Sequence, residues 1–170
     1  MLTLSIDILD RNLSALQARQ PEVAALIKSC ELPVGLVPAV GRDGTPTFMI
    51  PGEQGAVWLG GSSMPRASAE EMFGHVDPRG GSVTLPAMLT GMEAVVLAER
   101  LAPRFAVFVV DEPRAFKMAL SLRDYQSHFQ AGRIVLVVAD DIPARTRAFF
   151  SKNSGYALPA HMFKVPQIPE

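Results

Sequence analysis

Two runs of apolar residues constrain the fold of this chain more than any other feature. The first is FAVFVV at 105–110, and the second is IVLVV at 134–138. Each run has the length of a strand and lacks the alternation of polar and apolar residues that is typical of a strand with one face in water. We therefore predict two strands of a parallel sheet that is covered on both faces.

The segments around these runs favour a Rossmann-like, three-layer α/β core over residues 81–150. A shorter apolar run precedes the helical pattern MEAVVLAERL, and the pattern PRAFKMALSLRDYQSHF connects the two long runs as a single predicted helix. Strands that alternate with helices of this length pair in parallel through crossover connections. The predicted strands lie near 82–86, 105–110 and 134–138, and a short helix is expected over 143–150.

The amino-terminal part, residues 1–80, carries other patterns. Two short helices are predicted between Asp10 and Cys30, with Pro21 in the first turn of the second helix. A small antiparallel β meander should follow, with Asp43-Gly44 in its turn.

A third helix and the tail complete the expected organisation. Ser68 and Glu71 have the spacing of a capping box, which predicts a short helix over 69–75. The tail, residues 151–170, holds three prolines and is expected to be extended. No linker divides the chain, so we predict a single domain over 1–170.

Composition excludes several function classes. The chain has 170 residues, of which 48% are hydrophobic and 19% charged, and its net charge is -1. Nucleic-acid binding needs a clustered surplus of Lys and Arg, so no nucleic-acid partner is expected. The sequence also offers neither a signal peptide nor the roughly 18 apolar residues of a membrane span, which predicts a cytoplasmic protein with no membrane partner. The single cysteine, Cys30, is expected to be a small buried hydrophobe.

Three segments are predicted to meet at the carboxyl edge of the parallel sheet, where ligands bind in such folds. They contain Thr90-Gly91 after the first strand, Asp111-Glu112 after the second and Asp140-Asp141 after the third. A carboxylate after the second strand can accept hydrogen bonds from a ribose diol. Alternatively, Asp111 caps the following helix and Glu112 favours its positive end, without any ligand. Asp140 and Asp141 also have two interpretations: they contact a ligand, or they serve only in a helix cap or turn.

The turn after the first strand departs from a phosphate-binding loop. The stretch PAMLTGM offers only Gly91 where a dinucleotide-binding turn has three glycines, so tight dinucleotide binding is not expected. Gly60-Gly61 and Gly80-Gly81 lack the lysine of a P-loop. The three histidines have no ligand spacing, and no serine or cysteine has an evident base. The sequence therefore predicts no metal site and no identifiable catalytic residue.

Several of these segments resemble a known family. The order of SSMPRASAEEMF, the strand SVTLPA and VFVVDEPRAFKMALSLRDYQSHFQAGRIVLVVADD is similar to the amino-terminal part of bacterial motility accessory factor glycosyltransferases and 6-hydroxymethylpterin diphosphokinase-like proteins. The residues that match the family pattern are Glu112, Pro113, Phe116, Asp124 and the run 134–138. The resemblance covers about residues 36–150. The transferase domain that follows in the family is not in this sequence.

The resemblance implies a glycosyltransferase-associated accessory domain that binds a nucleotide or nucleotide sugar and lacks a complete catalytic site. Its expected partners are a small nucleotide-like ligand, and either further copies of the chain or a following transferase domain. Two alternatives stay open. One is an S-adenosylmethionine-dependent methyltransferase-like domain, which also places an acidic residue after the second strand. The other is a non-catalytic interaction or oligomerisation domain that uses the meander or an uncovered sheet edge.

Overall fold

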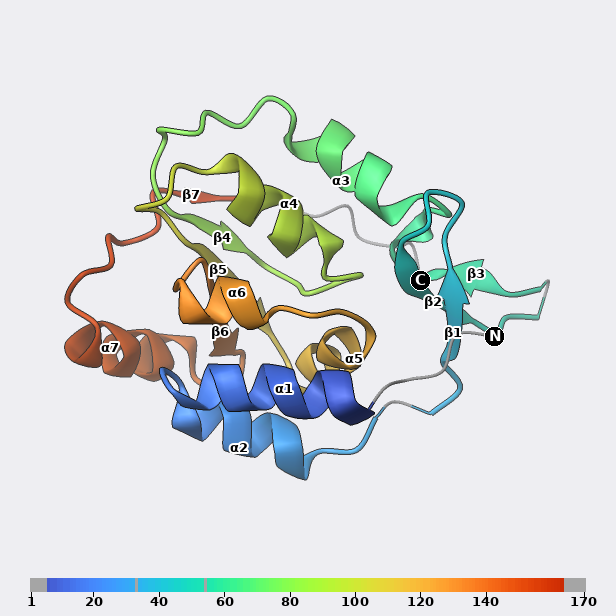
Figure 1. Ribbon diagram of the computed structural model, residues 1–170, viewed down its shortest axis with the longest axis horizontal. Coiled ribbons are helices and arrows are strands. Elements are labelled where there is room, and N and C mark those ends of the chain that lie inside the picture. Colours follow the sequence, from blue (N-terminus) through green and yellow to red (C-terminus); the bar gives the residue numbers. More distant parts are fainter. Residues whose placement is uncertain (1–5, 33, 54, 164–170) are drawn as a thin grey trace.

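The centre of the protein is a four-stranded parallel sheet (Figure 1). The computed structural model describes residues 6–32, 34–53 and 55–163. The strands of the sheet are β4 Val83–Leu85, β5 Val107–Asp111, β6 Ile134–Val138 and β7 His161–Met162. Helices flank the sheet and a separate antiparallel sheet accompanies it, so the predicted Rossmann-like α/β fold is confirmed.

The remaining elements follow the predicted order. The helices are α1 Ile6–Gln17, α2 Pro21–Ser29, α3 Pro65–Phe73, α4 Met92–Arg100, α5 Pro113–Leu122, α6 Gln126–Gln130 and α7 Ile142–Lys152. The antiparallel sheet consists of β1 Val37–Val40, β2 Pro46–Ile50 and β3 Val57–Trp58, followed by a 3₁₀ turn, Leu59–Gly61. Within the described residues, no helix is long and apolar enough to cross a membrane.

The strand order β6-β5-β4-β7 shows where the direction of strand addition changes. The chain adds β5 beside β4 and β6 beside β5, and then returns to place β7 on the other side of β4. The direction of strand addition thus reverses at β4. Folds of this kind bind ligands beyond the carboxyl ends of their strands. The reversal lies between β4 and β7, whereas the ends of β5 and β6 lie to one side of it.

Both faces of the sheet are covered, as the two apolar runs predict. Val107 and Val109 of β5 lie in a core formed with helices α1 to α6. Phe108 points to the opposite face, where its ring centroid lies 5.8 Å from that of Phe149 and 5.5 Å from that of Phe150, both in α7. One face is therefore packed by six helices and the other mainly by α7.

Helix α3 begins earlier than its predicted capping box. The helix starts at Pro65, and the Ser68 hydroxyl donates to the Ser62 hydroxyl instead of capping. The cap comes from Asp43 in the β1–β2 turn, whose Oδ2 accepts hydrogen bonds from the backbone N–H groups of Arg66 and Ala67. A side chain distant in sequence supplies the cap, so the predicted helix over 69–75 was wrong at its start.

The single helix predicted between the two apolar runs is two helices, α5 and α6. The break lies at 123–125, where a side chain of α1 takes over the backbone bonding. The Asn12 amide group donates to the carbonyls of Leu120 and Arg123, and its oxygen accepts from the Tyr125 N–H. These bonds satisfy groups that a continuous helix would pair internally, which explains why the helical pattern is interrupted.

The tail was predicted to be extended, and its residues 161–162 form the strand β7, whose pairing with β4 the sequence did not predict. The Ala160 N–H donates to the Ser82 carbonyl, and the Phe163 N–H donates to the Thr84 carbonyl. Phe163 packs against the core with its ring centroid 5.3 Å from that of Phe73. The tail therefore completes the parallel sheet.

The outer edge of β6 is occupied by a glutamine. The Gln20 side-chain amide donates to the Leu136 carbonyl at 2.6 Å, and its oxygen accepts from the Leu136 N–H at 3.1 Å. This pair of bonds imitates the pairing of another strand. Gln20 thus protects part of an edge that would otherwise expose unpaired backbone groups.

Replacing Gln20 by Ala should lower the free energy of unfolding by about 1–3 kcal/mol, because it leaves two partly buried backbone groups of Leu136 without partners. Urea denaturation measures this loss. The control is Gln17→Ala, on an exposed position of α1, which should be nearly neutral. Equal stabilities of the two variants would contradict a role for Gln20 at the sheet edge.

Candidate functional site

The predicted carboxyl edge exists, and two of the predicted acidic residues share a pocket there. Strands β5 and β6 are parallel, with Asp111 opposite Val138, so the residues that follow both strands emerge on the same side. Glu112 and Asp140 line an open pocket of about 400 Å³ together with Arg114. Glu112 and Asp140 therefore meet as the sequence predicted, and Arg114 adds a positive charge beside them.

Cys30 also lines this pocket, at the end of α2. It is half-buried, not buried as predicted, and its thiol donates to the Ile27 carbonyl. The Lys117 ammonium donates to the carbonyls of Lys28 and Cys30, which fixes the end of α2 against α5. Lys117 of α5 therefore holds the part of the pocket wall that Cys30 provides.

Asp111 links the first two strands of the parallel sheet. Its Oδ2 accepts a hydrogen bond from the Met88 N–H at 2.7 Å, and its Oδ1 accepts from the Glu112 N–H at 2.8 Å. The carboxylate thus joins the turn after β4 to the end of β5. Glu112 is the N-cap residue of α5, but its side chain makes no capping bond. Neither bond of Asp111 was anticipated by the two roles considered for it.

Thr90 and Gly91 lie in the interior, away from the open pocket. The Thr90 hydroxyl accepts from the Met92 N–H at 3.2 Å and donates to the Glu93 carboxylate at 2.7 Å. Both side chains are buried. Thr90 and the carboxyl group of Glu93 thus occupy the start of α4, where dinucleotide-binding proteins with a Rossmann-type sheet hold a phosphate.

The environment of Glu93 disfavours its negative charge. Burial raises the pKa of the Glu93 carboxyl, and this effect outweighs the hydrogen bond from Thr90 and the charge of Arg123, which both favour the ionised form. Sequence patterns missed Glu93, because a glutamate in the first helical turn is ordinarily a surface residue.

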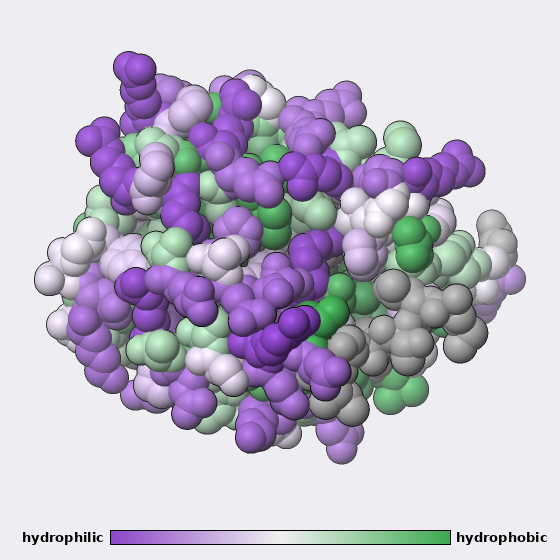
Figure 2. Space-filling view, in the orientation of Figure 1, coloured by the Kyte–Doolittle hydropathy of each residue, from purple (hydrophilic) through white to green (hydrophobic). Residues whose placement is uncertain are grey.

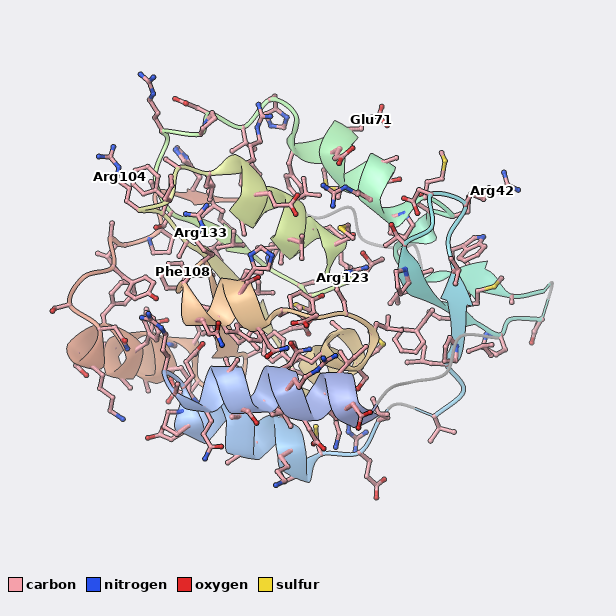
Figure 3. The ribbon with its side chains drawn as sticks, in the orientation of Figure 1. Arg42, Glu71, Arg104, Phe108, Arg123 and Arg133 are labelled. Carbon is pink, nitrogen blue, oxygen red and sulfur yellow. The ribbon has the colours of Figure 1, made fainter. Side chains whose placement is uncertain are left out.

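Arg123 connects this interior cluster to the antiparallel sheet (Figure 3). Its guanidinium donates to the Thr90 carbonyl at 3.2 Å and to the Pro46 carbonyl of β2 at 3.0 Å. A third, longer bond of 3.4 Å reaches the Tyr125 hydroxyl. Arg123 therefore holds the turn after β4, the α5–α6 junction and the meander together.

Position 91 must hold a glycine, because a larger side chain would collide with its neighbours. Its φ is +74°, and a Cβ at this position would lie 2.0 Å from the Tyr125 hydroxyl oxygen. Tyr125 is fully buried, and its ring stacks on Phe129. The single glycine of the turn therefore admits a tyrosine side chain of the protein itself, in the way that glycines of phosphate-binding loops admit a ligand.

Asp140 and Asp141 have separate local roles. The Asp140 carboxylate pairs with Arg145 at 2.9 Å, and this hydrogen-bonded guanidinium lowers the pKa of the exposed Asp140 carboxyl. Asp141 is the N-cap of α7 and accepts from the Ala144 N–H at 3.0 Å. Asp141 thus serves as a cap, which was one of its two predicted interpretations, whereas Asp140 both lines the pocket and pairs with Arg145.

Metal chemistry has no evident centre in the residues described. Across 6–32, 34–53 and 55–163, no group of three or more His, Cys, Asp or Glu side chains is placed to hold a metal ion. His75 and His161 line a separate pocket at the β4–β7 side, together with Asp77. His128 is partly buried, and burial lowers the pKa of its imidazole.

A pH titration of stability tests the buried carboxyl. Because the folded-state pKa of Glu93 is raised, the unfolding free energy should fall as the pH rises from the ordinary glutamate pKa through the folded value. Glu93→Gln removes this ionisation and keeps an oxygen for the Thr90 hydroxyl. The variant should therefore gain stability relative to the parent across this window, in urea denaturation at a series of pH values. Parallel pH profiles would contradict the burial argument, and Glu71→Gln on the exposed side of α3 is the control.

A double-mutant cycle tests why Gly91 is a glycine. Gly91→Ala should cost about 1–3 kcal/mol, from the positive φ and from the contact with the Tyr125 hydroxyl. Tyr125→Phe removes that oxygen, so Gly91→Ala should cost less in the Tyr125→Phe background. Denaturation measures both costs. If Gly91→Ala lowers the unfolding free energy equally in both backgrounds, only the positive φ requires a glycine at this position.

Comparison with known proteins leaves the family open. No family model, no curated protein and no solved structure matches this chain. The resemblance to motility accessory factor glycosyltransferases therefore stays a prediction. What is known of the site comes from its own geometry.

Proposed function

We propose that this chain is an accessory α/β domain that binds the nucleoside or sugar part of a nucleotide-type ligand in the pocket beyond β5 and β6. The observation that carries the proposal is that Glu112, Asp140 and Arg114 line one open pocket at the carboxyl edge of the sheet. Carboxylates accept hydrogen bonds from sugar hydroxyls, and a carboxylate after the second strand is the usual partner of a ribose in this type of fold. A nucleotide sugar is the ligand that the family resemblance implies.

The proposal limits where phosphates could bind. The first turn of α4 already holds the Thr90 hydroxyl and the Glu93 carboxyl, and Gly91 faces Tyr125. A diphosphate at that helix start would meet a buried acidic group and a filled interior. The nucleoside or sugar group is therefore the part of the ligand that we expect the protein to recognise, with Arg114 available to a neighbouring negative charge.

The proposed role is binding rather than catalysis. No residue of the pocket has a partner that would make it a general base, and the nearest ion pair, Asp140 with Arg145, holds its carboxylate in the charged form. In this proposal the domain acts in the cytoplasm, beside a glycosyltransferase activity located elsewhere. The methyltransferase-like alternative would use the same two acidic residues, Glu112 and Asp140. The two proposals differ in the ligand that they predict, a nucleotide sugar in one case and S-adenosylmethionine in the other.

Ligand-induced stabilisation tests the proposal. The melting temperature should rise with nucleotide sugars or cytidine nucleotides and stay unchanged with inorganic diphosphate, because only ligands that bind the folded state stabilise it. At a ligand concentration of 100 times its Kd, the gain is about 2.7 kcal/mol. A shift with S-adenosylmethionine alone would favour the methyltransferase-like alternative.

Matched variants locate the binding site. Glu112→Gln and Asp140→Asn should each reduce the ligand-induced shift, whereas Glu71→Gln, which lies on α3 outside this pocket, should retain it. Isothermal calorimetry gives the corresponding loss of affinity. A shift that survives both pocket substitutions, or the absence of any shift across the ligand panel, would refute binding at this pocket.

A further inference from the structure

A second cavity, of about 90 Å³, lies between the start of α2, the outer edge of β6 and helix α7. Its apolar walls include Val23, Val138 and Phe149, which are all buried. In Figure 2 the surface over α2 and α7 is mainly hydrophilic (purple, lower left), so the apolar walls lie beneath a polar surface. Since an apolar cavity of about 150 Å³ holds benzene, this cavity has room for about three or four carbon atoms.

The rim of this cavity carries a surplus of positive charge. Arg19, Arg145 and Lys152 line it, and Glu22 is the only acidic residue among the described residues that do so. The Glu22 carboxylate lies 3.9 Å from the Arg145 guanidinium and 3.3 Å from the Lys152 ammonium. Arg19 donates to a backbone carbonyl and to a tyrosine hydroxyl, both of which are neutral. The rim is therefore suited to a further negative charge.

Three backbone N–H groups beside the cavity have no acceptor in the part of the chain that the structure describes. The Gln20 side chain bonds to Leu136 and does not cap α2, which leaves the N–H groups of Glu22 and Val23 unpaired at the positive end of that helix. Val138 lies two residues beyond Leu136, so its N–H faces the same outer edge of β6. Val138 is 2% exposed, and a buried N–H without an acceptor costs free energy comparable to a lost hydrogen bond.

We propose that this cavity binds a small aliphatic carboxylate. The hydrocarbon part of the ligand packs against Val23, Val138 and Phe149, and its carboxylate lies at the rim. Carboxylate oxygens accept hydrogen bonds from N–H groups and pair with cations, and a helix N-terminus favours the same charge. A neutral apolar molecule would leave the N–H groups unpaired, and a small inorganic anion would leave the apolar walls without contacts.

The Glu22 carboxylate competes with the ligand for the cations of the rim. Its ion pairs with Arg145 and Lys152 cross the mouth of the cavity from α2 to α7. Both Glu22 and Lys152 have side chains that are more than half exposed, and ion pairs in such positions are weak. A ligand carboxylate can therefore replace Glu22 at these cations, and removal of the Glu22 charge should strengthen binding.

This binding is independent of the nucleotide-type ligand proposed above. The two cavities are neighbours, because Val138 lines both of them and Arg145 pairs with Asp140 of the other pocket. The two ligands differ in chemistry and are tested with different compounds. Failure of one proposal is therefore distinguishable from failure of the other.

Nuclear magnetic resonance of the full, isotope-labelled chain tests the inference directly. Titration with 3-methylbutanoate should shift the amide signals of Glu22, Val23 and Val138 in a saturable way, with a Kd on the order of millimolar for so small a ligand. Acetate lacks the hydrocarbon part and 3-methylbutanamide lacks the charge. Neither should give saturable shifts over the same concentrations.

Variants of the cavity change the affinity in opposite directions. Glu22→Gln should tighten binding and Lys152→Gln should weaken it, each by about two- to five-fold, because each alters one exposed charge at the rim. Ala148→Leu should abolish binding, since Ala148 lines the cavity and a larger side chain fills it. The matched controls are Arg147→Gln and Ala25→Leu, at exposed positions of α7 and α2 that do not line the cavity.

Any of three results would overturn the inference. The first is a parent protein without saturable shifts, and the second is equal binding of acetate or of the amide. The third is an affinity that falls in Glu22→Gln or persists unchanged in Ala148→Leu. Circular dichroism with thermal unfolding verifies that each variant is folded, and the two rim substitutions, at exposed positions, keep the test decisive if Ala148→Leu does not fold.

Discussion

The parallel pairing of β5 with β6 is the interaction on which the rest of the structure depends. Five residue pairs, from Val107 with Ile134 to Asp111 with Val138, hold the two apolar strands together. Parallel strands cannot be joined by a tight turn, so the connection must pass through helices that cover the sheet. The same pairing brings the residues after both strands to one edge. The pairing of β5 with β6 thus determines both the core and the place of the candidate pocket.

The turn after β4 illustrates how such a fold can exist without a phosphate at the first helix. In a dinucleotide-binding protein, glycines and free amides leave room for the ligand. Here Thr90 accepts from an amide of the first turn, the Glu93 carboxyl packs beside it, and Tyr125 approaches Gly91 closely. Side chains of the protein itself thus occupy the place that a phosphate takes in a dinucleotide-binding protein. These contacts stabilise the turn internally.

The elements that the sequence predicted correctly are those whose pattern lies within one short segment of the chain. The runs at 105–110 and 134–138 identified two strands because burial on both faces leaves a continuous apolar pattern. The short strand β7 has only His161 and Met162, both exposed, and therefore carries no such pattern. The start of α3 and the break between α5 and α6 depend on Asp43 and Asn12, which act across long sequence separations. No local window contains both partners.

The residues of the candidate site also divide into those that a short sequence pattern predicts and those that depend on tertiary packing. Glu112 and Asp140 were predictable, because parallel strands bring the residues after them to one edge. Arg114 could have been found by the same reasoning, since it follows β5 by only three positions. The burial of Glu93 depends on tertiary packing, which periodicity does not encode.

Arg123 joins the turn after β4 to the antiparallel sheet. One side chain bonds to the turn after β4 and to β2, so the position of the antiparallel sheet depends on the same guanidinium that supports the start of α4. Asp111 in turn ties that turn to the end of β5, next to Glu112. A continuous set of hydrogen bonds and chain connections thus runs from the meander, through the filled helix start, to the open pocket. The turn that holds Thr90 and Glu93 at the start of α4 is thus bonded, through Arg123, to the antiparallel sheet.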